Sequence, residues 1–110
     1  MVQFRALMNA NGDTATPLWV TELGWATDVT YAVTEQQKAE FITQWLIDLQ
    51  ALNIPVAVIY DLQGGDDPGY GLVNGSDVPN PAYYAVQQLV QGNSNPRPSF
   101  GLPALTVPWN

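Results

Sequence analysis

Two short apolar runs, one near residue 20 and one near residue 58, dominate the hydrophobic pattern of the chain. Leu18–Leu23 is rich in residues that suit a pleated sheet, and it follows Pro17, so we expect a strand there. Val56–Tyr60 is continuously apolar and is bounded by a proline and an aspartate. Continuous rather than alternating hydrophobicity predicts a second strand that is buried on both faces, as in a parallel sheet.

A long helical pattern separates the two runs. Thr34 and Gln37 have the spacing of a capping box, which marks the start of a helix. The helix is expected to continue to about Leu52 and to end before Pro55. Its apolar positions recur at helical spacing, which indicates a helix lying on a sheet. These positions are Phe41, Ile42, Trp45, Leu46, Leu49 and Leu52.

Two shorter helices and an irregular tail complete the pattern. Val2–Asn11 carries apolar residues on one helical face, and the glycine that follows is a natural stop. Asn80 followed by Pro81 predicts an N-cap and a first helical residue, and this helix is expected to end at Gly92. Residues 93–110 contain four prolines and show no periodicity, which predicts a tail or linker.

The predicted order of helix, strand, helix, strand, helix places the chain in the α/β class. Its two strands are expected to pair in parallel through a right-handed crossover. A chain of 110 residues forms one domain, which we place at residues 1–92. In such folds binding and catalytic residues gather where the strands end. The residues at these ends are Glu22, Gly24, Trp25, Tyr60, Asp61 and Gln63.

The charge balance is strongly acidic. Three basic residues stand against ten acidic ones, and the net charge is -7. Such a chain repels phosphate backbones and anionic lipid, so we expect neither nucleic acid nor a membrane surface as a partner. No apolar run approaches the roughly 20 residues of a membrane span. The polar residues Asn9–Asp13 also interrupt the apolar core that a signal peptide needs.

Cysteine and histidine are both missing from the chain. Without cysteine there is no disulfide framework, thiol nucleophile or thiolate zinc site, and without histidine there is no catalytic triad or imidazole metal site. The single lysine, Lys38, lies in the long helical pattern rather than at a strand end. Acid–base chemistry must therefore use carboxylates or tyrosines, and we expect no cofactor. The lack of cysteine is compatible with bacterial secretion.

Glu22 is the exception in an otherwise apolar strand. Burying a carboxylate is costly, so one at the end of a buried strand is either paired with donors or used in chemistry. Trp25 and Tyr60 have a similar ambiguity, because aromatic rings at strand ends either pack or stack on sugar rings. Trp19 lies in mid-strand and Trp45 lies on the helix stripe, so both are expected in the core.

Leu18–Trp25 resembles the seventh strand of (β/α)8-barrel retaining glycoside hydrolases similar to families 5 and 39, with the pattern apolar-Thr-Glu-apolar-Gly-aromatic. Three further segments agree in order and spacing. Glu35–Ala39 looks like the start of the seventh helix, and Val58–Leu62 resembles the eighth strand. Tyr70–Tyr83 is similar to the run that leads into the eighth helix. The resemblance covers roughly residues 1–90, and four pieces in register are specific where one alone is weak.

This resemblance implies a partial TIM barrel, the closing quarter of that fold. It also implies a glycosidase that hydrolyses O-glycosyl bonds of a carbohydrate substrate with retention of configuration. In the family the glutamate of this motif is the nucleophile, which assigns that role to Glu22. Trp25, Tyr60 and Asp61 are then expected to shape the sugar subsite.

The chain departs from the family in one important respect. The general acid/base of the family is a glutamate in an Asn-Glu pair after the fourth strand, and no such dipeptide occurs here. A complete barrel also needs at least about 200 residues. Asp61, Asp66 and Asp67 are the internal candidates for a partner of Glu22. Together with Asp77 they do not have the spacing of a 12-residue calcium loop, so no metal site is expected.

Three hypotheses follow from these observations. The first is a retaining glycosidase, and the second is a non-catalytic barrel fragment that acts as a self-assembling or carbohydrate-binding module. The third is an unrelated small α/β domain whose similarity to the motif is accidental. A two-stranded parallel sheet leaves both edges open and apolar surface uncovered. We therefore predict that the chain forms a homo-oligomer or associates with the missing part of a barrel.

Overall fold

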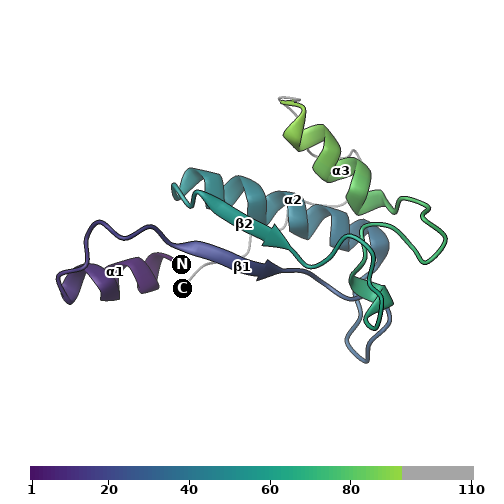
Figure 1. Ribbon diagram of the computed structural model, residues 1–110, viewed down its shortest axis with the longest axis horizontal. Helices are drawn as coiled ribbons and strands as arrows, with labels where there is room; N and C mark the ends of the chain where they lie inside the picture. Colours follow the sequence, from purple (N-terminus) through teal and green to yellow (C-terminus); the bar gives the residue numbers. More distant parts are fainter. Residues whose placement is uncertain (93–110) are drawn as a thin grey trace.

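Helices and strands alternate along the chain in the predicted order. The computed structural model describes residues 1–92, and the predicted tail, residues 93–110, lies outside the described residues. Within residues 1–92 the chain forms three α-helices and a two-stranded parallel sheet, which confirms the α/β class. Figure 1 shows their arrangement. A short 3-10 helix, η1, lies in the loop that follows the second strand. The bounds are α1 Val2–Ala10, β1 Trp19–Leu23, α2 Glu35–Ala51, β2 Val56–Ile59, η1 Pro68–Tyr70 and α3 Pro81–Val90.

β1 and β2 pair in parallel with one irregularity. Val20 pairs with Ala57, whereas Leu23, three residues later, pairs with Ile59, only two residues later in β2. Two residues of β1 therefore oppose a single residue of β2, which is a β-bulge. Glu22 is one of these two residues, so the bulge decides where its side chain points.

The start of α2 is determined by its own sequence. The Thr34 hydroxyl accepts a hydrogen bond from the backbone N–H of Gln37 at 3.1 Å, and the Gln37 side chain accepts one from the backbone N–H of Thr34 at 2.9 Å. The predicted capping box is thus confirmed. Leu52 is the C-cap residue and is 43% exposed, so the prediction that the buried stripe reaches it is wrong. The helix ends at this point, and the chain turns at Asn53 toward β2.

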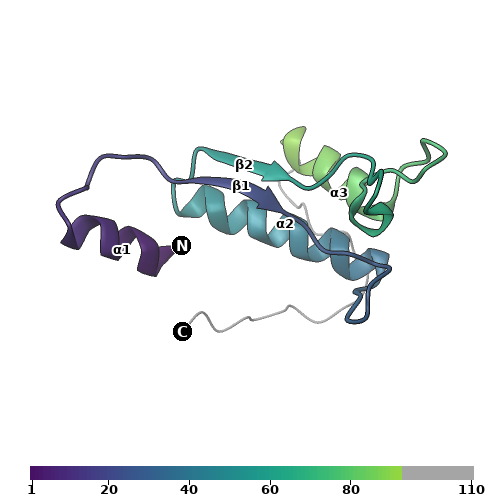
Figure 2. The same ribbon diagram turned by 60° about the horizontal axis from the view of Figure 1, so that its bottom comes forward.

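The core lies where α2, α3 and one face of the sheet meet. Alanines on both helices let α2 and α3 approach closely, and β2 contributes Ile59 to the edge of the cluster. Figure 2 shows α2 running beneath both strands, with α3 to one side. The buried cluster consists of Ala39, Ile42, Leu72, Ala82 and Ala85.

α3 begins and ends at the predicted positions. Asn80 occupies the N-cap position and Pro81 is the first helical residue, as expected. The Asn80 side chain does not cap the helix but donates a hydrogen bond to the Gly71 carbonyl oxygen at 3.0 Å. Gly92 follows the helix with a φ of 77°, a left-handed value that favours glycine.

The two faces of the sheet are covered unequally. The closed face, which carries Leu23 and Ile59, lies against α2 (Figure 2). The open face carries Trp19, Val58 and Tyr60, which are 61%, 50% and 36% exposed. The predictions that β2 is buried on both faces and that Trp19 lies in the core are therefore wrong, because within residues 1–92 no second layer packs on the open face.

α1 lies beyond the amino end of the sheet (Figure 1). It was expected over Val2–Asn11 and ends one residue earlier, and none of its residues is buried. Arg5 links it to the connecting loop by donating a hydrogen bond to the Thr16 carbonyl oxygen at 2.7 Å. No helix within residues 1–92 combines the length and the apolarity that a membrane span requires.

Candidate functional site

Glu22 lies at the carboxyl end of β1, on the open face of the sheet. Strict alternation along the strand would turn it to the same side as Val20, toward α2. The bulge changes this outcome, because Thr21 and Glu22 together oppose Val58 and both are exposed. Glu22 is therefore an accessible carboxylate on the face that also carries Tyr60.

Tyr60 follows β2 directly and lies next to the end of β1. Its backbone N–H donates a hydrogen bond to the Leu23 carbonyl oxygen at 2.8 Å, and its hydroxyl donates one to Asp67 Oδ2 at 2.7 Å. The hydrogen bond to Asp67, and next the negative charge of Asp67, raise the pKa of Tyr60 to about 12. Partial burial and the charges of Asp61 and Glu22 add to the rise. The hydrogen bond to Asp67 holds Tyr60 toward η1, and the pKa shift changes its protonation only above about pH 10.

Asp61, the residue after Tyr60, is partly enclosed. It is half-buried, and its backbone carbonyl oxygen accepts a hydrogen bond from the Leu72 N–H at 3.0 Å. One carboxylate oxygen, Oδ1, is shielded from solvent and has no hydrogen-bond partner among the described residues. A shielded oxygen is poorly placed for proton exchange with a substrate, which disfavours Asp61 as the proton donor.

Trp25 packs against the aromatic residues of α2. Its ring centroid lies 5.4 Å from that of Phe41 and 6.1 Å from that of Trp45, in tilted and edge-on arrangements. It is half-buried and contacts the core cluster. The packing role considered for Trp25 is therefore present in the structure, and stacking on a sugar stays a prediction. Trp45 is half-buried in the same aromatic group.

Gly24 lets two tyrosines lie against the end of β1. A Cβ atom at this position would overlap the Tyr60 carbonyl oxygen and would lie 3.0 Å from Cδ1 of Tyr70. The Tyr70 ring packs edge-on against the Tyr60 ring, with centroids 5.3 Å apart and planes at 73°. Position 24 therefore requires a glycine, because Tyr60 and Tyr70 approach the backbone too closely for a side chain.

Lys38 is the site residue that the sequence analysis missed. It is fully buried, and its Nζ lies 3.1 and 3.0 Å from the two carboxylate oxygens of Glu35. Nζ also donates to the carbonyl oxygens of Gly69 and Gly71, at 3.1 and 3.0 Å. The only signal in the sequence is that Lys38 lies one helical turn before Ile42 and hence on the apolar stripe of α2.

The chemistry available at this edge is that of carboxylates and one phenol. Within residues 1–92 no group of three metal-ligating side chains is placed to hold a metal ion. Asp66 is exposed in the loop before η1, and Asp67 is engaged by Tyr60. Glu22 is the carboxylate most open to solvent at a strand end, so it is the group best placed to act as a nucleophile or base.

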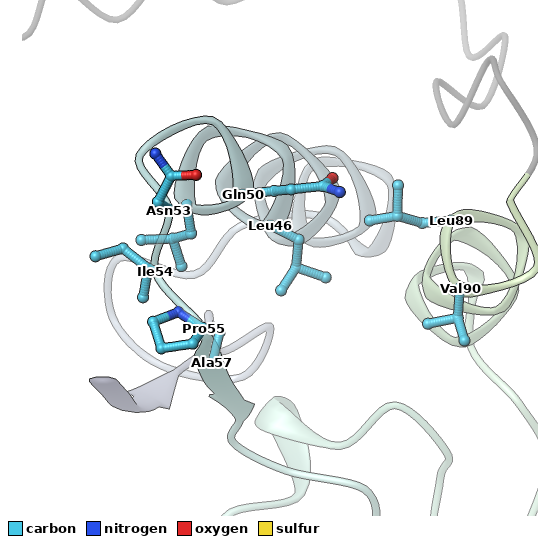
Figure 3. Close-up of a pocket in the computed structure, with 9 residues that line it drawn as sticks. Leu46, Gln50, Asn53, Ile54, Pro55, Ala57, Leu89 and Val90 are labelled. Atoms are coloured by element: carbon cyan, nitrogen blue, oxygen red, sulfur yellow. The ribbon is translucent and has the colours of Figure 1, made fainter. Parts of the chain in front are cut away.

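An apolar groove lies at the opposite end of the sheet (Figure 3). It has a volume of about 490 Å³ and opens between the C-terminal halves of α2 and α3. No carboxylate lines it, so it lies outside the candidate site. The groove is lined by Leu46, Leu49, Gln50, Asn53, Ile54, Pro55, Ala57, Leu89 and Val90.

Comparisons with models of protein families, with curated proteins and with solved structures found no match to this chain. Functional inference therefore starts from the residues themselves. The candidate site consists of Glu22, Tyr60, Asp61 and Asp67, with Gly24, Tyr70 and Lys38 behind them.

Proposed function

We propose that the carboxyl edge of the β1–β2 sheet is the nucleophile half of a retaining glycoside hydrolase site. The observation that carries the proposal is the β-bulge in β1, which brings Glu22 to the open face beside Tyr60. A bulge at a strand end costs ladder pairing, and it is commonly found where a side chain must be re-aimed next to an active site. The resemblance of Leu18–Trp25 to a nucleophile-bearing strand points to the same residue.

Each of the two steps gives Glu22 a defined role. In the first, the Glu22 carboxylate attacks the anomeric carbon of the sugar, and the bond from that carbon to the leaving oxygen breaks. The leaving oxygen takes a proton from a second carboxyl group. In the second step that group takes a proton from water, the water oxygen attacks the anomeric carbon, and the Glu22 carboxylate is released.

Tyr60 has two tasks in the proposed site. It is 36% exposed on the open side of the sheet, and we assign its ring to stacking on the sugar. Its hydroxyl is neutral at physiological pH, as in any tyrosine, and donates to Asp67 rather than adding charge beside the nucleophile. The hydrogen bond to Asp67 fixes the ring in this position.

The second carboxyl group is assigned to another chain, because residues 93–110 contain no aspartate or glutamate. Retaining enzymes need the two carboxyl groups about 5–5.5 Å apart. Asp67 is occupied by the Tyr60 hydroxyl and one oxygen of Asp61 is shielded, which disfavours both as the proton donor. The proposal thus predicts nucleophilic attack by this chain and weak turnover of unactivated substrates.

A fluorinated substrate with a good leaving group tests the nucleophile without the missing acid. We would incubate the protein with dinitrophenyl 2-deoxy-2-fluoroglycosides of several sugar configurations, because dinitrophenolate departs without a proton. The expected result is a mass increase of one fluoroglycosyl group, which peptide mapping locates on Glu22. Glu22→Gln should abolish labelling. Glu40→Gln, a change of the same type on α2, should leave labelling unchanged.

The absence of labelling across all configurations would overturn the proposal, as would labelling that persists in Glu22→Gln. Circular dichroism of each variant shows that the fold is kept, so that lost labelling is assigned to the carboxylate. The charge change is the same in both variants, which makes Glu40→Gln a matched control.

The open face favours a second candidate function, a self-assembling module. Trp19 and Val58 are 61% and 50% exposed on a sheet whose two strands are both edge strands within the described residues. Exposed apolar strands favour association with further strands. In this proposal another copy of the chain covers the open face.

Light scattering over a range of concentrations tests this second candidate. Self-association predicts a mass that rises above 12.0 kDa with concentration. Val58→Ser should lower the association, whereas Val29→Ser should not, because Val29 is equally exposed at 52% but lies in the β1–α2 loop. A monomer of 12.0 kDa at every concentration would exclude the assembly function.

A further inference from the structure

We infer that Lys38 is a positioning residue for the candidate site, acting through Tyr70 on Tyr60. The inference deepens the proposed function and rests on it, because it takes Tyr60 as part of the sugar site. Lys38 itself is fully buried and touches no surface that a substrate could reach. Its effect on the site is therefore expected to be indirect.

The position of Lys38 is unfavourable for folding alone. Burying an ammonium group costs desolvation energy, and an apolar residue of similar volume would often stabilise a core equally well. Lys38 also lies in the first turn of α2, where the partial positive charge of the helix N-terminus disfavours a cation. Glu35, one turn before it, offsets this charge with both carboxylate oxygens.

The contacts of Lys38 indicate what this costly position achieves. Nζ donates to the carbonyl oxygens of Gly69 and Gly71, the two residues on either side of Tyr70. The same carbonyls accept hydrogen bonds from Thr27 and Asn80, respectively. Lys38 is the donor that joins both carbonyls, so it fixes the backbone on each side of Tyr70.

Tyr70 transmits this constraint to the site. Its ring packs edge-on against Tyr60 at 5.3 Å and borders the space where Gly24 lacks a side chain. Tyr60 is thereby confined between the end of β1 and η1, with its hydroxyl 2.7 Å from Asp67 Oδ2. If the backbone around Tyr70 loosens, the hydrogen bond between Tyr60 and Asp67 should loosen with it.

Ionisation of Tyr60 at high pH reports this geometry directly. The hydrogen bond to Asp67 is the largest cause of the raised pKa of Tyr60, about 12, so loss of that bond should return the pKa toward 10. At pH 11 the ionised fraction of Tyr60 should then rise severalfold from roughly one tenth, with roughly nine tenths as the limit for a pKa that returns fully to 10. The fraction is measured by the NMR shift of the labelled tyrosine ring carbon, and Tyr60→Phe identifies the signal.

Lys38→Met is the first variant, because methionine keeps most of the side-chain volume and removes the donors. We expect a folded protein, by near-UV circular dichroism at pH 11, in which the ionised fraction of Tyr60 rises severalfold. A purely structural role would lower stability and leave this fraction in the folded protein unchanged. A folded Lys38→Met with the fraction of the parent protein would overturn the inference.

Tyr70→Leu provides a second test that leaves the buried charge intact and decides the question if Lys38→Met does not fold. It should raise the ionised fraction of Tyr60 in the same way, whereas Tyr83→Leu, which removes a half-buried ring from α3, should not. An unchanged fraction in Tyr70→Leu would overturn the inference. Failure of fluoroglycoside labelling at Glu22 with a positive result here would remove the glycosidase proposal and leave the positioning of Tyr60 established.

Discussion

The closed and open faces of the β1–β2 sheet are built from similar residues but have different environments. On the closed face Leu23 is 6% exposed and Ile59 packs on the core cluster. On the open face Trp19 is 61% exposed and Val58 is 50% exposed. The difference arises because α2 covers one face and nothing within residues 1–92 covers the other (Figure 2). Apolar composition therefore does not by itself show which face of a strand is buried.

The comparison also separates the residues that hold the fold together from the residues of the proposed site. The closed face contributes the apolar burial that holds the fold together. The open face carries the exposed carboxylate of Glu22 and the ring of Tyr60, which are the groups available to a ligand. Substitutions on the closed face should therefore change stability, and substitutions on the open face should change binding or association.

The largest expected effect is on the closed side. Ile42→Ala removes a fully buried side chain from the cluster between α2 and α3 and should lower the free energy of unfolding by about 2–5 kcal/mol. Val58→Ala on the open face should change it by no more than about 0.5 kcal/mol. Urea unfolding at low protein concentration measures both. Equal losses would show that the open face is covered in solution.

Gly24→Ala should have the next largest effect on stability, because there is no room for a side chain at the end of β1. The new methyl group would overlap the Tyr60 carbonyl oxygen, and overpacking of this kind costs about 1–3 kcal/mol. Gly65→Ala is the control, since no atom lies within 4 Å of a Cβ at that position. Thermal or urea unfolding should separate the two variants, and a Gly24→Ala protein as stable as Gly65→Ala would contradict the packing described here.

Removal of the α2 cap should weaken the layer that covers the closed face. Thr34→Ala deletes the hydroxyl that accepts the Gln37 N–H, and the loss of such a cap costs about 1 kcal/mol. Thr30→Ala, at an exposed loop position, should have almost no effect. The measurement is the free energy of unfolding in urea. A loss in Thr30→Ala as large as that in Thr34→Ala would argue against a specific capping role.

The smallest effect concerns the open face and appears only at high pH. The pKa of Tyr60 is raised in the folded state, so the hydrogen bond to Asp67 contributes stability that is fully present below pH 10. This contribution should decline as the pH rises from 10 through about 12. Unfolding measured across this interval should show the decline in the parent protein, and Tyr60→Phe should lack this part of it. An identical pH dependence in both proteins would contradict the assignment.

Local signals predicted the elements of the fold well. The Thr34–Gln37 capping box and the Asn80-Pro81 pair mark helix starts that the structure confirms. β1 begins one residue later than predicted and β2 ends one residue earlier. These features depend on neighbours within a few residues along the chain, so the sequence contains the information that determines them.

The candidate site was predicted only in part. Glu22 and Tyr60 were identified because they end apolar strands, and the structure places both on the open face. The β-bulge was not predicted, and without it Glu22 would point to the other side of the sheet. The sequence marks Asp67 as a candidate partner of Glu22, whereas in the structure it accepts the hydrogen bond of Tyr60.

The sequence by itself determined the α/β order of the elements, their capping residues, and the exclusion of cysteine and histidine chemistry. The tertiary structure decided three other features: which face of the sheet is covered, which way Glu22 points, and why Lys38 is buried. Each of these depends on strand register or on contacts between residues far apart in the chain. Lys38, for example, bonds to carbonyl groups 31 and 33 residues away, and no local pattern encodes such a contact.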